Sequence, residues 1–183
     1  MKEILNSKDI DSTLSRIAEE IVERNKGVQD LCLIGIQRGG AHLAKRLAEK
    51  IRIMVNKDVP VGTLDISFYR DDITIRRERP IVRKTDIAFD ITDRKVILVD
   101  DVLFTGRSIR AAMDALMDIG RPLEIQLAVL IDRGHREFPI CPQYTGKDVF
   151  TEMDETIEVE LSEEGHRDRV LIIDKGSQKR DDA

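Results

Sequence analysis

Residues 96–108, VILVDDVLFTGRS, combine a buried-strand pattern, two adjacent acids and the start of a helix. The stretch begins with four aliphatic residues, three of them β-branched, which is typical of a strand that is buried on both faces. Asp100 and Asp101 follow directly. We therefore expect both carboxylates where the strand emerges at its carboxyl end, the edge at which open parallel sheets bind ligands.

Four small or polar residues follow after a short turn: Thr105, Gly106, Arg107 and Ser108. Their hydroxyl and backbone N–H groups lie at the start of a helix expected over residues 106–120, and helix N-termini bind phosphate. The stretch thus pairs acids suited to a polyol or a metal with donors suited to phosphate. Ribose 5-phosphate carries this combination of groups.

Two other interpretations of residues 96–108 remain open. One is a core strand with a solvated acidic end and a capped helix. The other is a receiver domain, although a receiver carries its paired acids near the start of the domain and this pair lies mid-chain. The sequence contains neither G-x-x-x-x-G-K-[ST] nor G-x-G-x-x-G, which argues against a P-loop or dinucleotide-binding fold.

A second strand–turn–helix unit precedes this stretch. A strand is predicted over Leu31–Ile36 and a helix over residues 41–54, on either side of the turn Gln37, Arg38, Gly39 and Gly40. Glycines permit a close approach of the backbone to a ligand, and Arg38 supplies a fixed positive charge. The turn is interpreted as an anion-binding loop, with an ordinary turn and a surface arginine as the alternative.

The stretch resembles the 5-phosphoribosyl 1-pyrophosphate (PRPP) binding motif of type I phosphoribosyltransferases. The resemblance covers all thirteen positions: Val96, Ile97, Leu98, Val99, Asp100, Asp101, Val102, Leu103, Phe104, Thr105, Gly106, Arg107 and Ser108. Further segments are similar to the PyrR family, uracil phosphoribosyltransferases that can also act as pyrimidine operon attenuators. These segments are residues 65–72, 90–93, 114–122 and 132–137, and the whole resemblance spans about residues 9–174.

The resemblance implies an α/β fold of the type I phosphoribosyltransferase kind. Its features would be a central, mostly parallel sheet flanked by helices, a flexible hairpin lid and a small hood built from terminal segments. We expect a single domain over residues 1–183, with a flexible tail at 175–183. Strands are expected at residues 148–161 and 170–174, but the residues that read the base are not assigned.

The implied reaction converts uracil and PRPP to UMP and pyrophosphate. Asp100, Asp101 and Arg38 are the expected catalytic residues, and Gln37, Arg38, Gly39 and Gly40 the expected pyrophosphate loop. Mg²⁺ is the expected cofactor, bound mainly through PRPP. The alternatives are a phosphoribosyltransferase for another base, purine or orotate, and a regulator with little enzyme activity.

The lid is expected at about residues 69–85, between strands at 61–69 and 85–88. Residues 70–84 contain six basic and three acidic side chains, and Arg70 and Arg83 are the candidate contacts on closure. A lid excludes water from a reactive intermediate. A solvated hairpin tip is the alternative.

A strand expected over residues 124–131 ends at Asp132, which is a candidate for contact with metal or pyrophosphate. His135 and Arg136 follow closely. The resemblance implies that they contact RNA, and the alternative is that they brace their loop. Attenuator members carry a Thr-Arg-Gly type loop where this chain has Gln37, Arg38, Gly39 and Gly40. Other implied partners are UMP or UTP, an mRNA leader hairpin and further copies of the chain, in a homodimer or higher homo-oligomer.

The composition suits a globular protein in the cytoplasm. Of the 183 residues, 36% are charged and 41% hydrophobic, and the formal net charge is −5. No apolar run approaches the roughly 20 residues of a membrane span, and the N-terminus lacks a secretory pattern. The acidic balance is atypical of a dedicated nucleic-acid binder. Cys32 lies in a strand pattern and Cys141 in a loop, so a disulfide between them is not expected.

Overall fold

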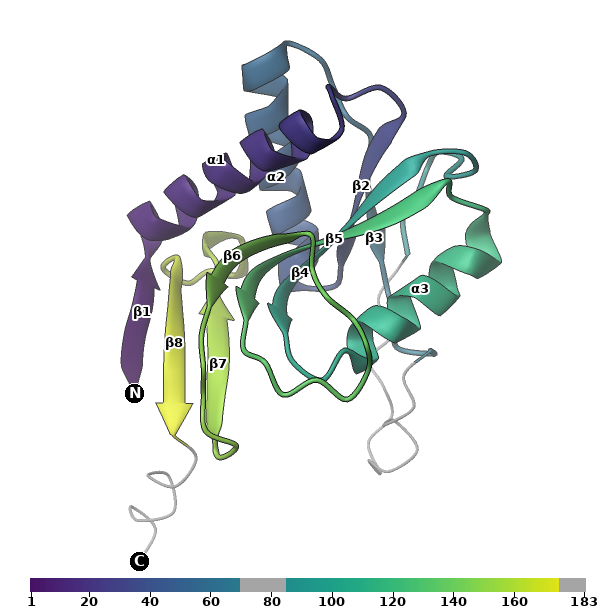
Figure 1. Ribbon diagram of the computed structural model, residues 1–183. Helices are drawn as coiled ribbons and strands as arrows, with labels where there is room; N and C mark the ends of the chain where they lie inside the picture. The colour runs from purple at the N-terminus through teal and green to yellow at the C-terminus, as the bar shows by residue number, and fades with distance from the viewer. Residues whose placement is uncertain (70–84, 175–183) are drawn as a thin grey trace, which may run out of the picture.

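The computed structural model describes residues 1–69 and 85–174, which form two sheets and their flanking helices (Figure 1). The larger sheet is parallel, with the strand order β3-β2-β4-β5-β6. Its strands are β2 (Leu31–Ile36), β3 (Val61–Leu64), β4 (Lys95–Leu103), β5 (Glu124–Asp132) and β6 (Tyr144–Asp148). β4 is the central strand, which explains why its aliphatic residues are buried on both faces.

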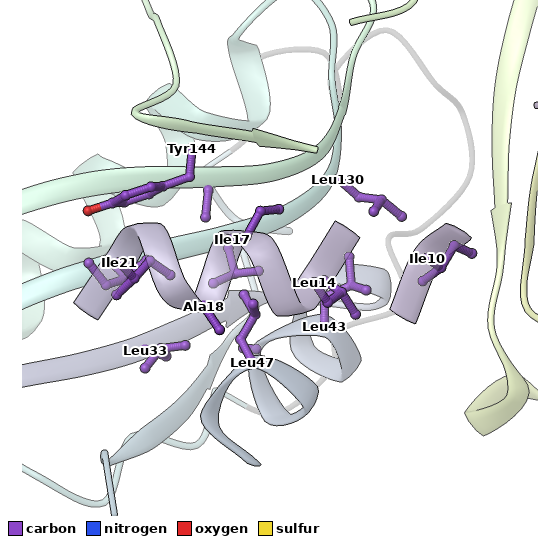
Figure 2. Close-up of a cluster of buried hydrophobic side chains, with 14 of the residues drawn as sticks. Ile10, Leu14, Ile17, Ala18, Ile21, Leu33, Leu43, Leu47, Leu130 and Tyr144 are labelled. Atoms are coloured by element: carbon purple, nitrogen blue, oxygen red, sulfur yellow. The ribbon is translucent and has the colours of Figure 1, made fainter. Parts of the chain in front are cut away.

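Helices cover both faces of this sheet. α1 (Ser7–Arg24) and α2 (Gly39–Val55) pack on one face, and α3 (Arg107–Ile119) packs on the other. Because successive side chains of a strand point to opposite faces, Ile97 and Val99 join the first core and Val96 and Leu98 join the second. Figure 2 shows part of the first core, including Ile10, Leu14, Ile17, Ala18, Ile21, Leu33, Leu43, Leu47, Leu130 and Tyr144.

A capping box fixes the start of α1. The side chain of Asn6 accepts hydrogen bonds from the N–H groups of Lys8 and Asp9, and the Asp9 carboxylate accepts one from the Asn6 N–H. Such reciprocal bonds satisfy donors that the first helical turn leaves open. The first turn of α1 therefore follows directly on the strand that ends at Asn6.

The smaller sheet is antiparallel and joins the two ends of the described chain. Its order is β1-β8-β7, with β1 (Lys2–Asn6), β7 (Glu155–Glu160) and β8 (Arg169–Asp174); the short 3₁₀ helix η2 (Ser162–Glu164) lies between β7 and β8. We call this unit the hood. The predicted hood from terminal segments is confirmed, although β1 was not expected. Leu5, Ile157, Leu161 and Val170 place the hood in the same core as α1 and α2.

Three strand predictions were too long. The strand expected over residues 61–69 ends at Leu64, because Asp65 accepts a hydrogen bond from the Ser67 N–H and turns the chain. Residues 85–88 contribute only an isolated antiparallel bridge, between Asp86 and Thr63. Residues 149–154, expected within one long strand, separate β6 from β7.

Several expectations concern segments outside the described residues. The lid arginines Arg70 and Arg83 and the tail at 175–183 belong to this group. Within the part of the chain that the structure covers, no helix is long and apolar enough to cross a membrane. Cys32 is buried in β2, Cys141 is exposed, and both are free thiols.

Candidate active site

The two acids lie inside β4 and not beyond its end. The sequence placed them after the strand, but β4 continues to Leu103 and Asp100 pairs in register with Val129 of β5. Asp100 is buried, at 8% exposure, and lines two neighbouring cavities, whereas Asp101 lines only the larger one. Their different surroundings follow from the alternation of side chains along a strand.

Asp101 has an unusual protonation equilibrium. Burial raises the pKa of its carboxyl above the ordinary value, and the hydrogen bond from the Val102 N–H, at 2.7 Å, partly opposes the shift. The negative charge of Glu164 raises this pKa further. Such perturbation is common at functional sites, although structural networks also produce it.

The predicted pyrophosphate loop connects β2 with α2, and its glycines allow it to pack against β4. The Gln37 N–H donates to the carbonyl of Leu64 at 3.0 Å, and the peptide bond between Gln37 and Arg38 is cis. A Cβ added to Gly40 would lie 2.3 Å from the carbonyl oxygen of Val99. α2 begins at Gly39, two residues earlier than predicted, so its amino end lies at the acids of β4.

The predicted phosphate turn lies between β4 and α3. Gly106 has a φ of +91°, a conformation that favours glycine, and Thr105 Oγ1 accepts a hydrogen bond from the Arg107 N–H at 3.3 Å. The Arg107 guanidinium pairs with Glu137, with Nε 2.7 Å from Oε2. A cavity of about 390 Å³ adjoins the turn and is lined by residues that include Asp100, Thr105, Gly106, Arg107 and Ser108.

A larger cavity, of about 670 Å³, separates the carboxyl edge of the parallel sheet from the hood. We call it the cleft. The core contributes the predicted loop and acids, and the hood contributes β7 and the segment after it. The lining includes Gln37, Arg38, Gly39, Asp65, Ser67, Asp100, Asp101, Ser108, Ile157, Glu158, Val159, Glu160, Glu164 and His166. Residues predicted from two separate strand–turn–helix units therefore meet in one cavity.

Asp132 and Arg136 are tied to each other. The guanidinium of Arg136 pairs with the Asp132 carboxylate at 2.5 Å and also donates to the carbonyls of Phe104 and Ile140, both at 2.9 Å. These contacts support the bracing alternative for Arg136, because its bonds lie within the loops around β4 and β5. They also occupy one oxygen of the carboxylate proposed for metal or pyrophosphate.

His135 is exposed but it also makes a local contact. Its Nε2 lies 2.7 Å from the carbonyl oxygen of Thr151, and its ring meets Phe104 edge to face at 5.9 Å between centroids. These contacts orient the ring, and the residue remains accessible at the surface. An RNA contact by His135 therefore stays a prediction.

Arg133 has a structural role that sequence reasoning missed. It is buried at 6% exposure, its guanidinium lies 4.0 Å from the centroid of Phe104, and it donates to Thr151 Oγ1 at 3.0 Å and the Glu155 carbonyl at 3.1 Å. Burial lowers the pKa of this guanidinium. Arg133 thus ties the end of β5 to the start of hood strand β7. Nothing in the sequence distinguished it from the neighbouring Arg136.

Arg46 on α2 attaches the hood on its other side. Its guanidinium donates to Glu163 at 2.7 and 2.5 Å and to Asp168 at 2.7 and 2.9 Å, and it also contacts Ser162. These bonds are the main reason why the pKa values of Glu163 and Asp168 are lowered. Paired, charge-assisted contacts of this kind hold η2 firmly against α2.

The chain is similar in sequence to known proteins over most of its length. Residues 1–165 match the phosphoribosyl transferase domain family. The chain is 55% identical over 174 residues to the bifunctional protein PyrR of Bacillus cereus (strain AH820), which covers 94% of this chain and 97% of the relative. PyrR of Bacillus mycoides (strain KBAB4) is equally similar.

Solved structures with low sequence identity share the fold. A hypoxanthine phosphoribosyl transferase of Trypanosoma cruzi superposes with a TM-score of 0.74 at 16% identity, over 100% of this chain and 96% of that one. A hypoxanthine-guanine phosphoribosyltransferase of Bacillus anthracis gives 0.69 at 20% identity, over 93% and 96%. The predicted type I phosphoribosyltransferase fold is confirmed, and the chain belongs to the phosphoribosyl transferase domain family and, within it, to the PyrR proteins.

Proposed function

We propose that this protein is a uracil phosphoribosyltransferase that converts uracil and PRPP to UMP and pyrophosphate. The observation that carries the proposal is the cleft, in which Asp100, Asp101 and the Arg38 loop face a small hood. A ribose that carries a pyrophosphate, together with a separate planar base, fits a cavity with these three parts. Membership in the PyrR proteins favours uracil as the base.

The 5-phosphate of PRPP would occupy the cavity beside Thr105, Gly106, Arg107 and Ser108. Residues at the start of α3 line that cavity, and the positive φ of Gly106 shapes the turn. Binding at this end fixes the ribose above β4. The reaction then gains from orientation, which converts an encounter between two substrates into a step within one complex.

Asp100 and Asp101 would accept hydrogen bonds from the ribose hydroxyls. Departure of pyrophosphate leaves positive charge on the ribose ring, similar to the oxocarbenium-like state of glycoside cleavage. A buried carboxylate stabilises that charge more than a solvated one, because the surroundings screen it less. Arg38 and the amino end of α2 would hold the leaving pyrophosphate.

The residues of the cleft fit Mg²⁺ that arrives with the substrate. Within residues 1–69 and 85–174, no group of three or more His, Cys, Asp and Glu side chains could hold a metal ion alone. Mg²⁺ usually keeps several waters and binds through one or two carboxylates and substrate phosphates, which Asp100 or Asp101 could supply. When bound, it would neutralise charge on the pyrophosphate.

The base would lie between the acids and strand β7 of the hood. Ile157 and Val159 line the cleft from this strand, together with Glu158 and Glu160. A planar base needs both an apolar surface and polar groups that fix its edge. β7 supplies side chains of both kinds and, as an edge strand of the hood sheet, main-chain groups.

The test is PRPP-dependent conversion of uracil, orotate, adenine, hypoxanthine and guanine, each with and without Mg²⁺. Formation of UMP from uracil alone, dependent on Mg²⁺, is the expected result. Turnover of a purine or of orotate would contradict the assignment of uracil and leave the reaction type in place. No turnover of any base would favour a regulator that uses the site to sense nucleotides.

A second proposed activity is RNA-binding control of pyrimidine gene expression by transcription attenuation, with UMP or UTP setting the affinity. The observation in its favour is the name of the relatives, bifunctional protein PyrR. A nucleotide in the cleft can change RNA affinity if the protein has two conformations that bind RNA with different affinity. The nucleotide must also bind one of these conformations more tightly than the other.

RNA binding is tested with a leader hairpin from a pyrimidine operon, titrated with and without UMP. The expected result is an affinity that rises with UMP and falls steeply with salt, because phosphate contacts release counterions. His135→Ala is the informative variant, since Arg136 also braces the loops at Phe104 and Ile140. Binding that ignores both salt and UMP would contradict this second activity.

A further inference from the structure

Two neighbouring glutamates in η2 have different surroundings. Glu163 is fixed by Arg46, with two short hydrogen bonds to the guanidinium. Glu164 approaches Arg38 and His42 at the start of α2 without a hydrogen bond to either. Its Oε1 lies 3.6 Å from Arg38 Nε and 3.9 Å from His42 Nε2, and this buried oxygen has no hydrogen-bond partner.

The position of Glu164 is set by other residues. Arg46 bonds to both Glu163 and Asp168, and Asp168 also accepts the Ser162 N–H at 2.7 Å. These contacts hold the turn without help from Glu164. A residue whose role was to brace the hood would itself make hydrogen bonds of normal length, so the position of Glu164 calls for another explanation.

The carboxylate of Glu164 acts on the cleft through its charge. It lines the same cavity as Arg38, Asp100 and Asp101, and its charge contributes to the raised pKa of Asp101. The side chain is about one-fifth exposed, whereas that of Arg38 is mostly exposed. An incompletely bonded carboxylate thus lies beside the cation that is proposed to hold pyrophosphate.

We propose that Glu164 is a positioning residue that competes with pyrophosphate for Arg38 and limits how tightly this product is held. The inference rests on the proposed function, which assigns pyrophosphate to the Arg38 loop. Pyrophosphate brings several negative charges next to a carboxylate that the hood holds in place. Like charges that lie close together repel, and the repulsion is stronger where water is partly excluded. Weaker binding speeds product release, and product release is the rate-limiting step of many enzymes.

The experiment compares Glu164→Gln with Glu163→Gln, two isosteric changes at adjacent positions. Calorimetry measures the Kd of pyrophosphate with Mg²⁺, and steady-state kinetics measure its inhibition constant against PRPP and the KM for uracil. Glu164→Gln should bind pyrophosphate roughly five- to tenfold more tightly, with the KM for uracil and the Tm unchanged. Glu163→Gln should lower the Tm and leave the Kd within about twofold of the wild type.

Three outcomes would overturn the inference. Unchanged or weaker pyrophosphate binding by Glu164→Gln, with a wild type that binds pyrophosphate normally, refutes the role of Glu164 and leaves the proposed function intact. An equal gain in both variants would mean that any loss of hood charge suffices, against a specific role. A wild type that binds neither pyrophosphate nor PRPP would refute the proposed function and this inference together.

Discussion

The side chain of Asp101 occupies the space that a side chain at Gly39 would need. A Cβ added to Gly39 would lie 2.3 Å from Oδ2 of Asp101, well inside van der Waals contact. The catalytic acid predicted from one motif and the glycine predicted from another therefore depend on each other. The close contact explains why the loop carries glycine at this position, beyond the exposure of its N–H group.

We predict that Gly39→Ala and Gly40→Ala fail in different ways. The new Cβ in Gly39→Ala meets only side-chain atoms of Asp101, so the carboxylate must shift. We expect a small change in the Tm while kcat/KM falls on the order of 100-fold. In Gly40→Ala the Cβ meets the backbone of Val99, so the free energy of unfolding should fall by about 1–3 kcal/mol as well. Thermal melts and PRPP kinetics of both variants check this. Equal effects on stability would contradict it.

Asp101→Asn should lower activity and raise stability. Loss of the carboxylate should reduce kcat by about 10²–10³, by analogy with other electrostatic contacts to a transition state. Because burial raises the pKa of Asp101 in the folded protein, its charge opposes folding as pH rises above the ordinary value of 3.8 toward the raised one. The asparagine variant should therefore be more stable than the wild type at pH 7.

The pH dependence of stability distinguishes the loss of the Asp101 charge from an unrelated change in packing. The stability difference between wild type and Asp101→Asn should shrink as pH falls from the raised pKa through 3.8, and it should vanish well below 3.8, where the wild-type carboxyl is protonated in both states. Asp114→Asn, at an exposed position of α3, is the matched control and should change neither kcat nor stability appreciably. A difference that is constant with pH would refute the explanation.

Arg46→Met should weaken the attachment of the hood to α2. It removes the partner of Glu163 and Asp168, so we expect a loss of about 2 kcal/mol in the free energy of unfolding at pH 7. Because both carboxyl pKa values are lowered in the fold, this stabilisation is present above the ordinary values of 4.5 and 3.8 and is lost as pH falls through the lowered ones.

The matched control for Arg46→Met lies on the same helix. Arg52 pairs with Glu49 three residues earlier, and both side chains are about half exposed. Exposed pairs of this kind contribute little, so Arg52→Met should leave unfolding nearly unchanged. Denaturant titrations at pH 7 and pH 3.5 measure both variants. A similar loss of unfolding free energy in both variants would contradict the prediction that the Arg46 contacts stabilise the fold more than an exposed ion pair does.

The two cysteines should differ in reactivity. Burial in β2 raises the pKa of Cys32 to about 11, so its thiolate is scarce at pH 8, while Cys141 is exposed. A colorimetric thiol reagent at pH 8 should label one thiol per native chain and two after denaturation. Cys141→Ser should reduce the native value to zero. Rapid labelling of Cys32 in the native protein would indicate that β2 opens readily.

The sequence predicted β2, β4 and β5 because these strands are buried on both faces and carry long aliphatic runs. It did not predict β6, in which only Tyr144 is buried. The sequence pattern placed Asp100 and Asp101 at the end of the strand, whereas β4 continues to Leu103. Two carboxylates in a row end the apolar pattern, even though the hydrogen bonds to β5 continue. β1 was missed for the opposite reason. It is a short edge strand with only Leu5 buried, so it carries little periodic signal.

The candidate site was predicted in its core half and not in its hood half. Motif spacing identified the residues around Arg38 and Asp101, because each motif is local in sequence. Glu164 and Arg133 act across elements that the sequence separates widely, and their roles depend on which neighbours they meet. An arginine in a polar loop gives no indication that it will be buried against Phe104.

The two cores on opposite faces of the sheet have an evolutionary consequence. The hood packs into the core that contains α1 and α2, whereas α3, which follows the phosphate turn, packs into the other. Mutations that reshape the hood can therefore accumulate together with compensating changes in α1 and α2 without disturbing α3. A lineage could exchange one base for another in this way and inherit its phosphate chemistry unaltered.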